Sequence, residues 1–178
     1  DGLGLIKTAA DIEPLARQVD SSDGVAFVPA LAGLGAPYWD QDARGTITGI
    51  TRGTRAAHLA RATLEGIAFE VWDLLDAMTK DAARDLTALK VDGGAAKNDL
   101  LAQFQADVAQ VKVCRPIEVE STGRGAAMLA GVGAGLSDLA AAERMVKLDR
   151  TFEPAIGADA RAAHIARWRR AIEQTRTR

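Results

Sequence analysis

Residues 91–108, VDGGAAKNDLLAQFQADV, contain an apolar run that ends in an acid and two glycines and then passes directly into a helical pattern. Gly93 and Gly94 tolerate positive φ angles and allow close approach to the backbone, and the alanines that follow have small side chains. In parallel α/β folds, ligands collect at such junctions because free amides and the helix dipole face one crevice. The stretch predicts a tight strand–helix turn that either only connects two elements or also holds an anion such as a phosphate.

The chain on both sides of this turn alternates strand-like and helical patterns. Strand-like runs cover residues 88–93 and 111–116, and helical spacing covers residues from about 96 to 110 and from about 122 to 133. The order strand, helix, strand, helix predicts an α/β fold with a mostly parallel sheet and crossover helices.

Shorter elements are expected nearer the ends of the chain. They are a helix over residues 11–18 capped by Asp11, strands over 25–31 and 46–50, and a C-terminal helix from about residue 157. The C-terminal helix carries Ile165, Trp168 and Ile172 on one face, which predicts that it docks on the rest of the domain.

A long helix is expected from about Arg55 to Thr79, where apolar residues recur at helical spacing. Gly66 lies in its middle, where glycine costs about 1 kcal/mol relative to alanine, so a close packing partner is expected there. Glu65 and Glu70 lie on the same helix, and a solvated or helix-pairing role is expected for them rather than catalysis.

Composition and charge argue against several classes of partner. The 178 residues carry a formal net charge of -2, so no strong field favours a nucleic acid or an anionic membrane. The sequence contains neither an apolar run of about 18 residues nor a signal-peptide pattern, which favours a cytoplasmic protein. The chain begins with Asp1 rather than methionine, and a fragment of a longer protein is expected.

Few residues suit redox or metal chemistry. The single cysteine, Cys114, cannot form an internal disulfide and lies in VKVCRP, which reads as a short buried strand, so an inert core thiol is expected rather than a reactive one. His58 and His164 lie far apart, and neither has a cysteine or carboxylate at metal-ligand spacing. No metal-binding residue is therefore assigned.

Two familiar phosphate-binding motifs are not matched. A Walker loop ends in Gly-Lys-Ser/Thr, and the sequence has no such triplet. In TGRGAAMLAG, residues 122–131, Gly123 and Gly125 have the first spacing of a dinucleotide fingerprint, but Met128 occupies a position that must stay small. These glycines instead predict a helix that starts near another backbone, with Thr122 as its cap.

Three motifs resemble the FGGY family of carbohydrate kinases. GLGAPYWDQDARGTITGITRG, residues 33–53, contains GAPYWD, which is more similar to family members that phosphorylate glycerol than to those that act on other sugars. The overlapping GTITGITRGTRAAHLARATLE, residues 45–65, resembles the family's C-terminal signature, and VDGGAAKND, residues 91–99, resembles its second nucleotide loop. The resemblance extends over essentially the whole chain. The sequence departs from the family's usual residues at Ala32, Gln41 and the pair Gly123–Arg124.

The resemblance implies an ATPase domain of the actin/hexokinase (ribonuclease H-like) type, of which this chain is the C-terminal portion, and it favours a ligand at the glycine turn. It implies that Gly94 binds a nucleotide phosphate through its backbone and that Asn98 approaches the adenosine. Gly93 and Ala95 would shape the loop around them.

The resemblance also implies the activity of a longer protein, which transfers a phosphoryl group from ATP, with Mg²⁺, to glycerol in a cleft between two domains. Such transfer needs a positioning carboxylate, Mg²⁺ ligands and phosphate-binding groups. In this family these groups and the glycerol pocket lie upstream of Asp1. Residues 1–178 are therefore expected to form the C-terminal nucleotide-binding domain, without the N-terminal substrate domain and the first strands of its own domain. No catalytic residue is assigned, and the isolated segment is expected to be inactive.

Several points stay open at the level of sequence. Asp92 ends the strand beside the loop, where it either serves a Mg²⁺-bound water, braces the loop or is only solvated. The alternative functions are a kinase of another polyol or sugar, such as xylulose or gluconate, and a non-catalytic nucleotide-binding or assembly domain. The resemblance further implies a homo-oligomer.

Overall fold

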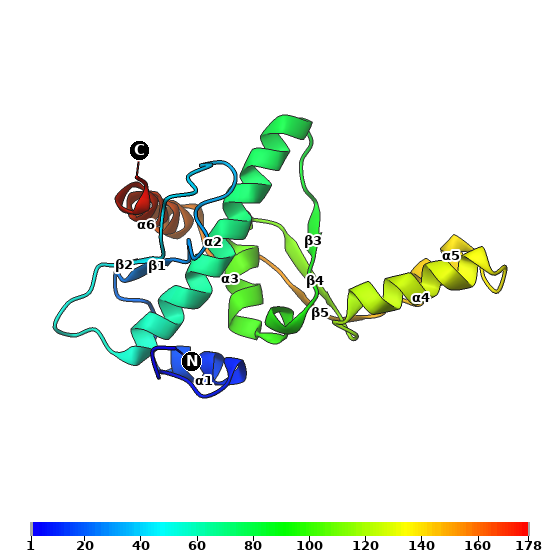
Figure 1. Ribbon diagram of the computed structural model, residues 1–178, viewed down its shortest axis with the longest axis horizontal. Coiled ribbons are helices and arrows are strands. Elements are labelled where there is room, and N and C mark those ends of the chain that lie inside the picture. The colour runs from blue at the N-terminus through cyan, green and yellow to red at the C-terminus, as the bar shows by residue number, and fades with distance from the viewer. Residues whose placement is uncertain (1, 178) are drawn as a thin grey trace.

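One long helix, α2, runs through the centre of the molecule and has a small sheet on either side (Figure 1). The computed structural model describes residues 2–177. The first elements are η1, a 3-10 helix (Ala9–Asp11), α1 (Ile12–Ala16), β1 (Ala26–Val28), β2 (Thr46–Thr48) and α2 (Ala56–Ala82). They are followed by β3 (Ala88–Lys90), the 3-10 helix η2 (Gly94–Lys97), α3 (Asp99–Ala109), β4 (Lys112–Pro116), α4 (Ser121–Gly133), α5 (Leu139–Arg144), β5 (Leu148–Phe152) and α6 (Ala158–Thr175).

The predicted long helix is confirmed as α2, and Gly66 is where it meets β1. A β-carbon added at Gly66 would lie 2.2 Å from the carbonyl oxygen of Phe27. Such a contact is too short for any side chain, so only glycine lets the helix approach the strand this closely. The expected packing partner is therefore the backbone of β1.

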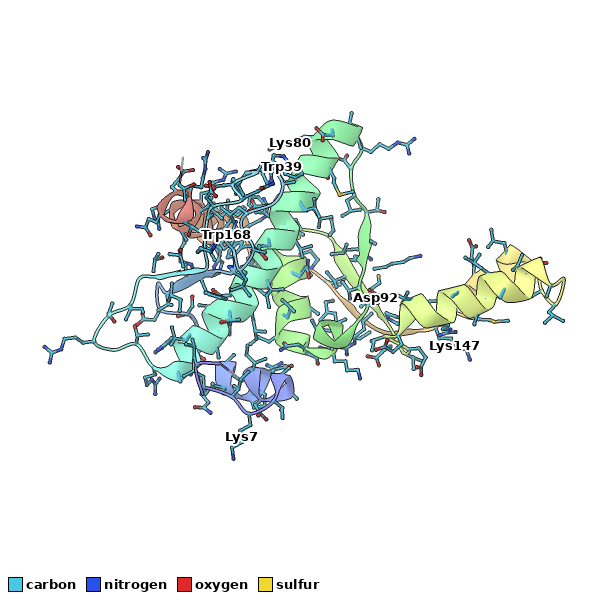
Figure 2. The ribbon with its side chains drawn as sticks, viewed as in Figure 1. Lys7, Trp39, Lys80, Asp92, Lys147 and Trp168 are labelled. Atoms are coloured by element: carbon cyan, nitrogen blue, oxygen red, sulfur yellow. The ribbon has the colours of Figure 1, made fainter. Side chains whose placement is uncertain are left out.

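Three aromatic rings join α2 to two other helices. Phe69 of α2 stacks on Trp168 of α6 at a centroid distance of 5.1 Å and meets Phe104 of α3 edge-on at 5.3 Å. Trp168, labelled in Figure 2, is only 1% exposed. Its Nε1 donates to Asp73 Oδ2 at 2.7 Å. Aromatic side chains bury large apolar areas, and this cluster confirms the predicted docking of the C-terminal helix.

The sheet that carries the glycine turn contains β3, β4 and β5 in that order. β3 and β4 are parallel, with Leu89 opposite Val113, and α3 forms the crossover between them, as predicted. The remaining pairs depart from the expectation of a mostly parallel sheet. β5 is antiparallel to β4, and β1 and β2 form a separate antiparallel pair.

The pattern of exposure explains why β5 is missing from the sequence-based prediction. Four of its five side chains are exposed and only Phe152 is buried, so the strand has none of the apolar character of a buried parallel strand. Its place in the sheet depends on pairing with β4 rather than on its own composition.

Helices α4 and α5 form an arm that extends away from the sheets (Figure 1). No residue of α4 is buried, and the arm exposes Leu129 at 63% and Leu136 at 84%. The helix α4 was expected near this position, whereas α5 is short and was not predicted. The expectation that α4 starts beside another backbone is not met in this chain, because its glycines meet almost nothing.

Two predicted helix caps are wrong. The carboxylate of Asp11 accepts from the backbone nitrogens of Lys7 at 3.1 Å and Thr8 at 2.8 Å, so it closes the turn before α1 instead of capping α1. Thr122 lies inside α4, and Glu120 occupies the capping position without a side-chain hydrogen bond. Asp11 does occupy the position before α1, but its side chain bonds to the preceding turn, whereas α4 begins two residues earlier than the sequence suggests.

The cysteine and the two histidines lie in surroundings that differ in part from those expected. Cys114 is half-buried rather than a core residue, because β4 alternates and turns Val113 and Arg115 to the buried face. His58 Nδ1 accepts from the Arg55 nitrogen at 2.9 Å at the start of α2, and His164 lies edge-on to the ring of Phe104.

Two further findings concern the described part of the chain as a whole. Within residues 2–177, no three His, Cys, Asp or Glu side chains gather in a way that could hold a metal ion. No helix in the same range combines the length and apolar character that crossing a membrane requires.

Candidate functional site

The candidate site is the turn that follows β3. Gly93 has φ 80° and ψ 176°, a conformation that side chains other than glycine rarely adopt. Its nitrogen donates to Val119 O at 2.8 Å, and its carbonyl oxygen accepts from the nitrogen of Ala96 at 3.2 Å. Of the two glycines, only Gly93 has a positive φ, and Gly94 begins the 3-10 helix η2.

The α-helix after the turn starts later than predicted, at Asp99 rather than near residue 96. Asn98 caps it, because Asn98 Oδ1 accepts from the nitrogen of Leu101 at 2.9 Å. Glu13 Oε2 of α1 accepts from the nitrogen of Asp99 at 3.1 Å. Early amides of α3 are therefore satisfied within the chain.

The amides available to an anion are those at the start of η2. The first amides of any helix have no acceptor within the helix itself, which here applies to Gly94 and Ala95. Both residues are exposed, and a β-carbon added at Gly94 would meet nothing within 4 Å. The turn thus presents open backbone, as a phosphate-binding loop requires.

A groove of about 300 Å³ lies beside this turn. Its walls include Leu89 and Val91 from the β3 segment, Ile67 from α2 and Gln105 from α3. Gln105 is only 6% exposed, and its Nε2 has no hydrogen-bond partner among the described residues. A largely apolar hollow with few polar groups is typical of ligand sites.

Asp92 also lines this groove and has an exposed side chain. Figure 2 shows it near the point where the arm leaves the body of the molecule. Asp92 lies just after β3, directly beside the turn, so its position fits each of the roles left open for it.

One residue that holds the turn is not recognisable from the sequence. Arg115 of β4 is 9% exposed and donates to carbonyl oxygens of η2 and to Asp99 and Asp149. The segment VKVCRP, residues 111–116, contains both Lys112 and Arg115, and the sequence does not show that only Arg115 is buried. The partner Asp149 lies 34 residues further along the chain, so no local pattern identifies it.

The acids on α2 have no place at this turn. Glu65 is 3% exposed and binds Arg61 at 3.0 Å, Arg167 of α6 at 2.6 Å and the Ser22 hydroxyl at 2.9 Å. The helix-pairing role is thus confirmed for Glu65. Glu70 is exposed on the same helix.

The GAPYWD loop lies away from the turn, against α2 and the C-terminal end of the chain. Tyr38 donates to Asp73 at 2.9 Å, and burial raises the pKa of the Asp73 carboxyl group. Asp40 accepts from the nitrogen of Thr177 at 2.7 Å, whereas Trp39 is 76% exposed. Trp39 and Asp92 lie well apart in Figure 2, so the two motifs do not form one site in this chain.

The architecture is that of an α/β domain with an exposed glycine turn after a parallel strand, and comparison with known proteins identifies the family. Residues 4–134 match the model of the FGGY family of carbohydrate kinases, C-terminal domain. The chain belongs to this family.

The similar proteins include glycerol kinases. The chain is 55% identical over 177 residues to a glycerol kinase of Aromatoleum aromaticum, covering 99% of this chain and 36% of that protein. The crystal structure of Plasmodium falciparum glycerol kinase with ADP matches with a TM-score of 0.88 at 33% identity, covering 98% of this chain and 35% of that one. Ligand-bound xylulose kinase from Lactobacillus acidophilus matches with a TM-score of 0.78 at 28% identity, covering 96% and 35%.

These similarities confirm the predicted family and the ATPase fold of the actin/hexokinase type. The chain spans about a third of the length of the proteins that it matches. The roles expected of Gly93, Gly94, Ala95 and Asn98 stay predictions.

Proposed function

We propose that this chain supplies the nucleotide-binding wall of a longer kinase that transfers a phosphoryl group from ATP to glycerol. The observation that carries the proposal is that the chain is more similar, in structure and in sequence, to a glycerol kinase than to a xylulose kinase. The match to a glycerol kinase has a TM-score of 0.88 and 33% identity, against 0.78 and 28% for a xylulose kinase. The 55% identity to a glycerol kinase over nearly the whole chain supports the same substrate.

In this proposal the nucleotide binds at the turn between β3 and α3. A phosphate accepts from the amides of Gly94 and Ala95, and Gly93 gives the backbone the conformation that exposes them. The adenosine lies towards Asn98. Because Asn98 Oδ1 already accepts from the nitrogen of Leu101, the side chain has its amide nitrogen left to donate to the nucleotide.

Magnesium would accompany ATP and neutralise charge on the phosphates. No set of three ligating side chains exists among the described residues, so this chain does not fit a protein-only metal site. The exposed carboxylate of Asp92, beside the turn, suits a contact with a water of the ion's hydration shell. We assign the direct ligands, and the carboxylate that orients the glycerol hydroxyl, to the part of the kinase outside residues 1–178.

The proposed kinase is expected to act in the cytoplasm as a homo-oligomer. A kinetic assay of the full-length protein tests its substrate. We expect phosphoryl transfer from ATP to glycerol with a kcat/KM at least about tenfold above that for xylulose or gluconate, a difference of about 1.4 kcal/mol in transition-state binding. A preference for xylulose or gluconate would contradict the substrate. Nucleotide binding without transfer to any of the three would favour a non-catalytic domain.

The isolated chain offers a second test, because it has only one side of the nucleotide site. Losing about three hydrogen bonds to charged phosphates, at about 1.5–3 kcal/mol each, removes roughly 4.5–9 kcal/mol of the about 8 kcal/mol that micromolar binding represents. We expect millimolar or weaker binding of Mg-ADP in an NMR titration, with shifts confined to the amides of residues 93–98. Saturable shifts elsewhere in the chain would contradict the assigned site.

A further inference from the structure

A buried arginine lies beneath the glycine turn, on the neighbouring strand. Nη1 of Arg115 donates to the carbonyl oxygens of Ala96 at 3.1 Å and Lys97 at 3.2 Å, and to Asp99 Oδ1 at 2.7 Å. These acceptors belong to the end of η2 and the first residue of α3. One guanidinium group therefore holds the place where the turn becomes a helix.

The other side of the same guanidinium is anchored to β5. Nε and Nη2 of Arg115 reach Asp149 Oδ2 at 2.9 Å and 2.8 Å. Arg150 binds the second oxygen of Asp99 at 2.6 Å. Both guanidinium groups lie over the ring of Phe152, at 5.3 Å and 4.6 Å from its centroid, where cation–π attraction adds to the ion pairs.

The chemistry of arginine suits this place. Its planar fork donates in several fixed directions at once, whereas lysine offers a single compact charge on a flexible stem. Burial alone would lower the pKa of Arg115, but the hydrogen bonds with Asp99 and Asp149 outweigh it and raise the pKa. The group is permanently charged. Because it is buried and its nitrogens bind protein oxygens, it acts on the turn rather than on a ligand.

We propose that Arg115 is a positioning residue, which fixes the carbonyl oxygens of Ala96 and Lys97 beneath η2 and thereby aims the amides of Gly94 and Ala95 at the nucleotide phosphate. Carbonyl and amide groups of one helical turn point in opposite directions along its axis. Anchoring the carbonyls at one end therefore sets the direction of the amides at the other. This inference rests on the proposed function.

The test compares Arg115→Gln with Arg167→Gln in the full-length protein. Arg167 is a matched control, because its side chain is 18% exposed against 11% for Arg115, and it also binds a buried acid, Glu65, at 2.6 Å. It lies on α6, and its side chain bonds to Glu65 and His164, neither of which belongs to the turn.

Hydrogen–deuterium exchange reads the turn without reference to activity. In Arg115→Gln we expect amides of residues 93–98 to exchange about tenfold faster, with α6 unchanged. In Arg167→Gln we expect faster exchange in α6 and unchanged exchange at residues 93–98. Unchanged exchange at the turn in a folded Arg115→Gln protein would overturn the positioning role.

Steady-state kinetics links the turn to the nucleotide. Arg115→Gln is expected to raise KM for ATP about tenfold while KM for glycerol stays within twofold, and Arg115→Lys is expected to restore part of the loss. Arg167→Gln should leave both KM values within twofold. An equal rise in both KM values for Arg115→Gln would point to general damage and contradict the proposal.

A separate variant covers the case in which Arg115→Gln fails to fold. Asp149→Asn removes only the outer anchor, from an exposed position on β5. It is expected to speed exchange at residues 93–98 two- to threefold and to raise KM for ATP by a similar factor, and no change in either would refute the proposal. A wild-type protein without kinase activity would refute the proposed function, whereas the exchange data would still decide whether Arg115 holds the turn.

Discussion

Two glycine- and alanine-rich stretches follow neighbouring strands in this chain. One is held in place by hydrogen bonds, and the other lies in an exposed helix. GGAAKN, residues 93–98, follows β3 and becomes a turn that Val119, α3 and Arg115 of β4 hold through hydrogen bonds. TGRGAAMLAG, residues 122–131, follows β4 and lies in α4, a helix without a buried residue. Similar composition therefore produces a fixed site in one place and an exposed arm in the other.

The two stretches differ in whether the backbone conformation requires glycine. Gly93 has φ 80°, so the turn needs a glycine for conformational reasons. Gly123 and Gly125 lie inside α4, and β-carbons added there would meet nothing within 4 Å. Nothing in the described part of the chain requires glycine at those two positions. Whether a position requires glycine depends on its φ angle and on the space around it. Substituting alanine at different glycines separates the effect of backbone conformation from the effect of steric contact.

The largest effect is expected at Gly66, which extends the comparison to a buried glycine. Gly66→Ala places a β-carbon 2.2 Å from the carbonyl oxygen of Phe27, and neither backbone can yield without moving α2 or β1. Overpacking of this kind costs about 3 kcal/mol, partly offset by the helix propensity of alanine. We expect a lower urea midpoint. A midpoint equal to that of the wild type would show that α2 and β1 are further apart than the structure places them.

The next effect is expected at Gly93, where conformation rather than space is limiting. Gly93→Ala must adopt φ 80° and ψ 176°, which costs a residue with a β-carbon about 2 kcal/mol. The free energy of unfolding should fall by that amount. Gly94→Ala is the matched control, because Gly94 has no positive φ and has free space around it, so its stability should change by less than about 0.5 kcal/mol. Equal losses in the two variants would disprove the conformational argument.

A smaller effect of opposite sign is expected in the arm. Gly125→Ala removes backbone freedom inside α4 without any clash, which should stabilise the helix by about 0.5–1 kcal/mol. Hydrogen–deuterium exchange of residues 121–133 should slow up to about fivefold. Faster exchange would mean that α4 packs closely against another surface through this glycine.

The smallest effect is expected from His164 in the packed half of the molecule. Burial lowers the pKa of this imidazole, and the positive charge of Arg167 lowers it further, while Glu65 and Asp107 act in the other direction. The folded state therefore binds the proton less readily than the unfolded chain, whose histidines titrate near pH 6.5. The free energy of unfolding should fall as the pH drops below about 6.5 towards the folded-state value, because the unfolded state then binds more protons.

His164→Gln removes this contribution and is the control for it. The wild type should lose more stability between pH 7 and pH 5 than the variant does, measured by urea unfolding at each pH. Parallel pH profiles for the two proteins would show that the imidazole is not buried as its packing against Phe104 of α3 requires.

Much of the fold follows from local patterns. The helical spacing of α2, the glycines before α3 and the apolar face of α6 each identified an element, because periodicity and φ preferences act over a few residues. The small strands and caps were less predictable. β5 carries almost no apolar signal, and Asp11 and Asn98 satisfy backbone groups whose positions depend on where the chain bends.

Part of the candidate site also follows from the sequence, and part depends on the tertiary structure. The sequence by itself predicted a tight turn between a strand and a helix at residues 93–98, because two consecutive glycines allow backbone angles that other residues rarely adopt. The tertiary structure alone decided that Glu13 and Asn98 occupy early amides of α3, and that Arg115 joins the turn to Asp149. Those contacts connect residues up to 86 positions apart. Such pairs arise from the packing of whole elements, because burying a charge is stable only where the fold brings its partner within hydrogen-bonding distance.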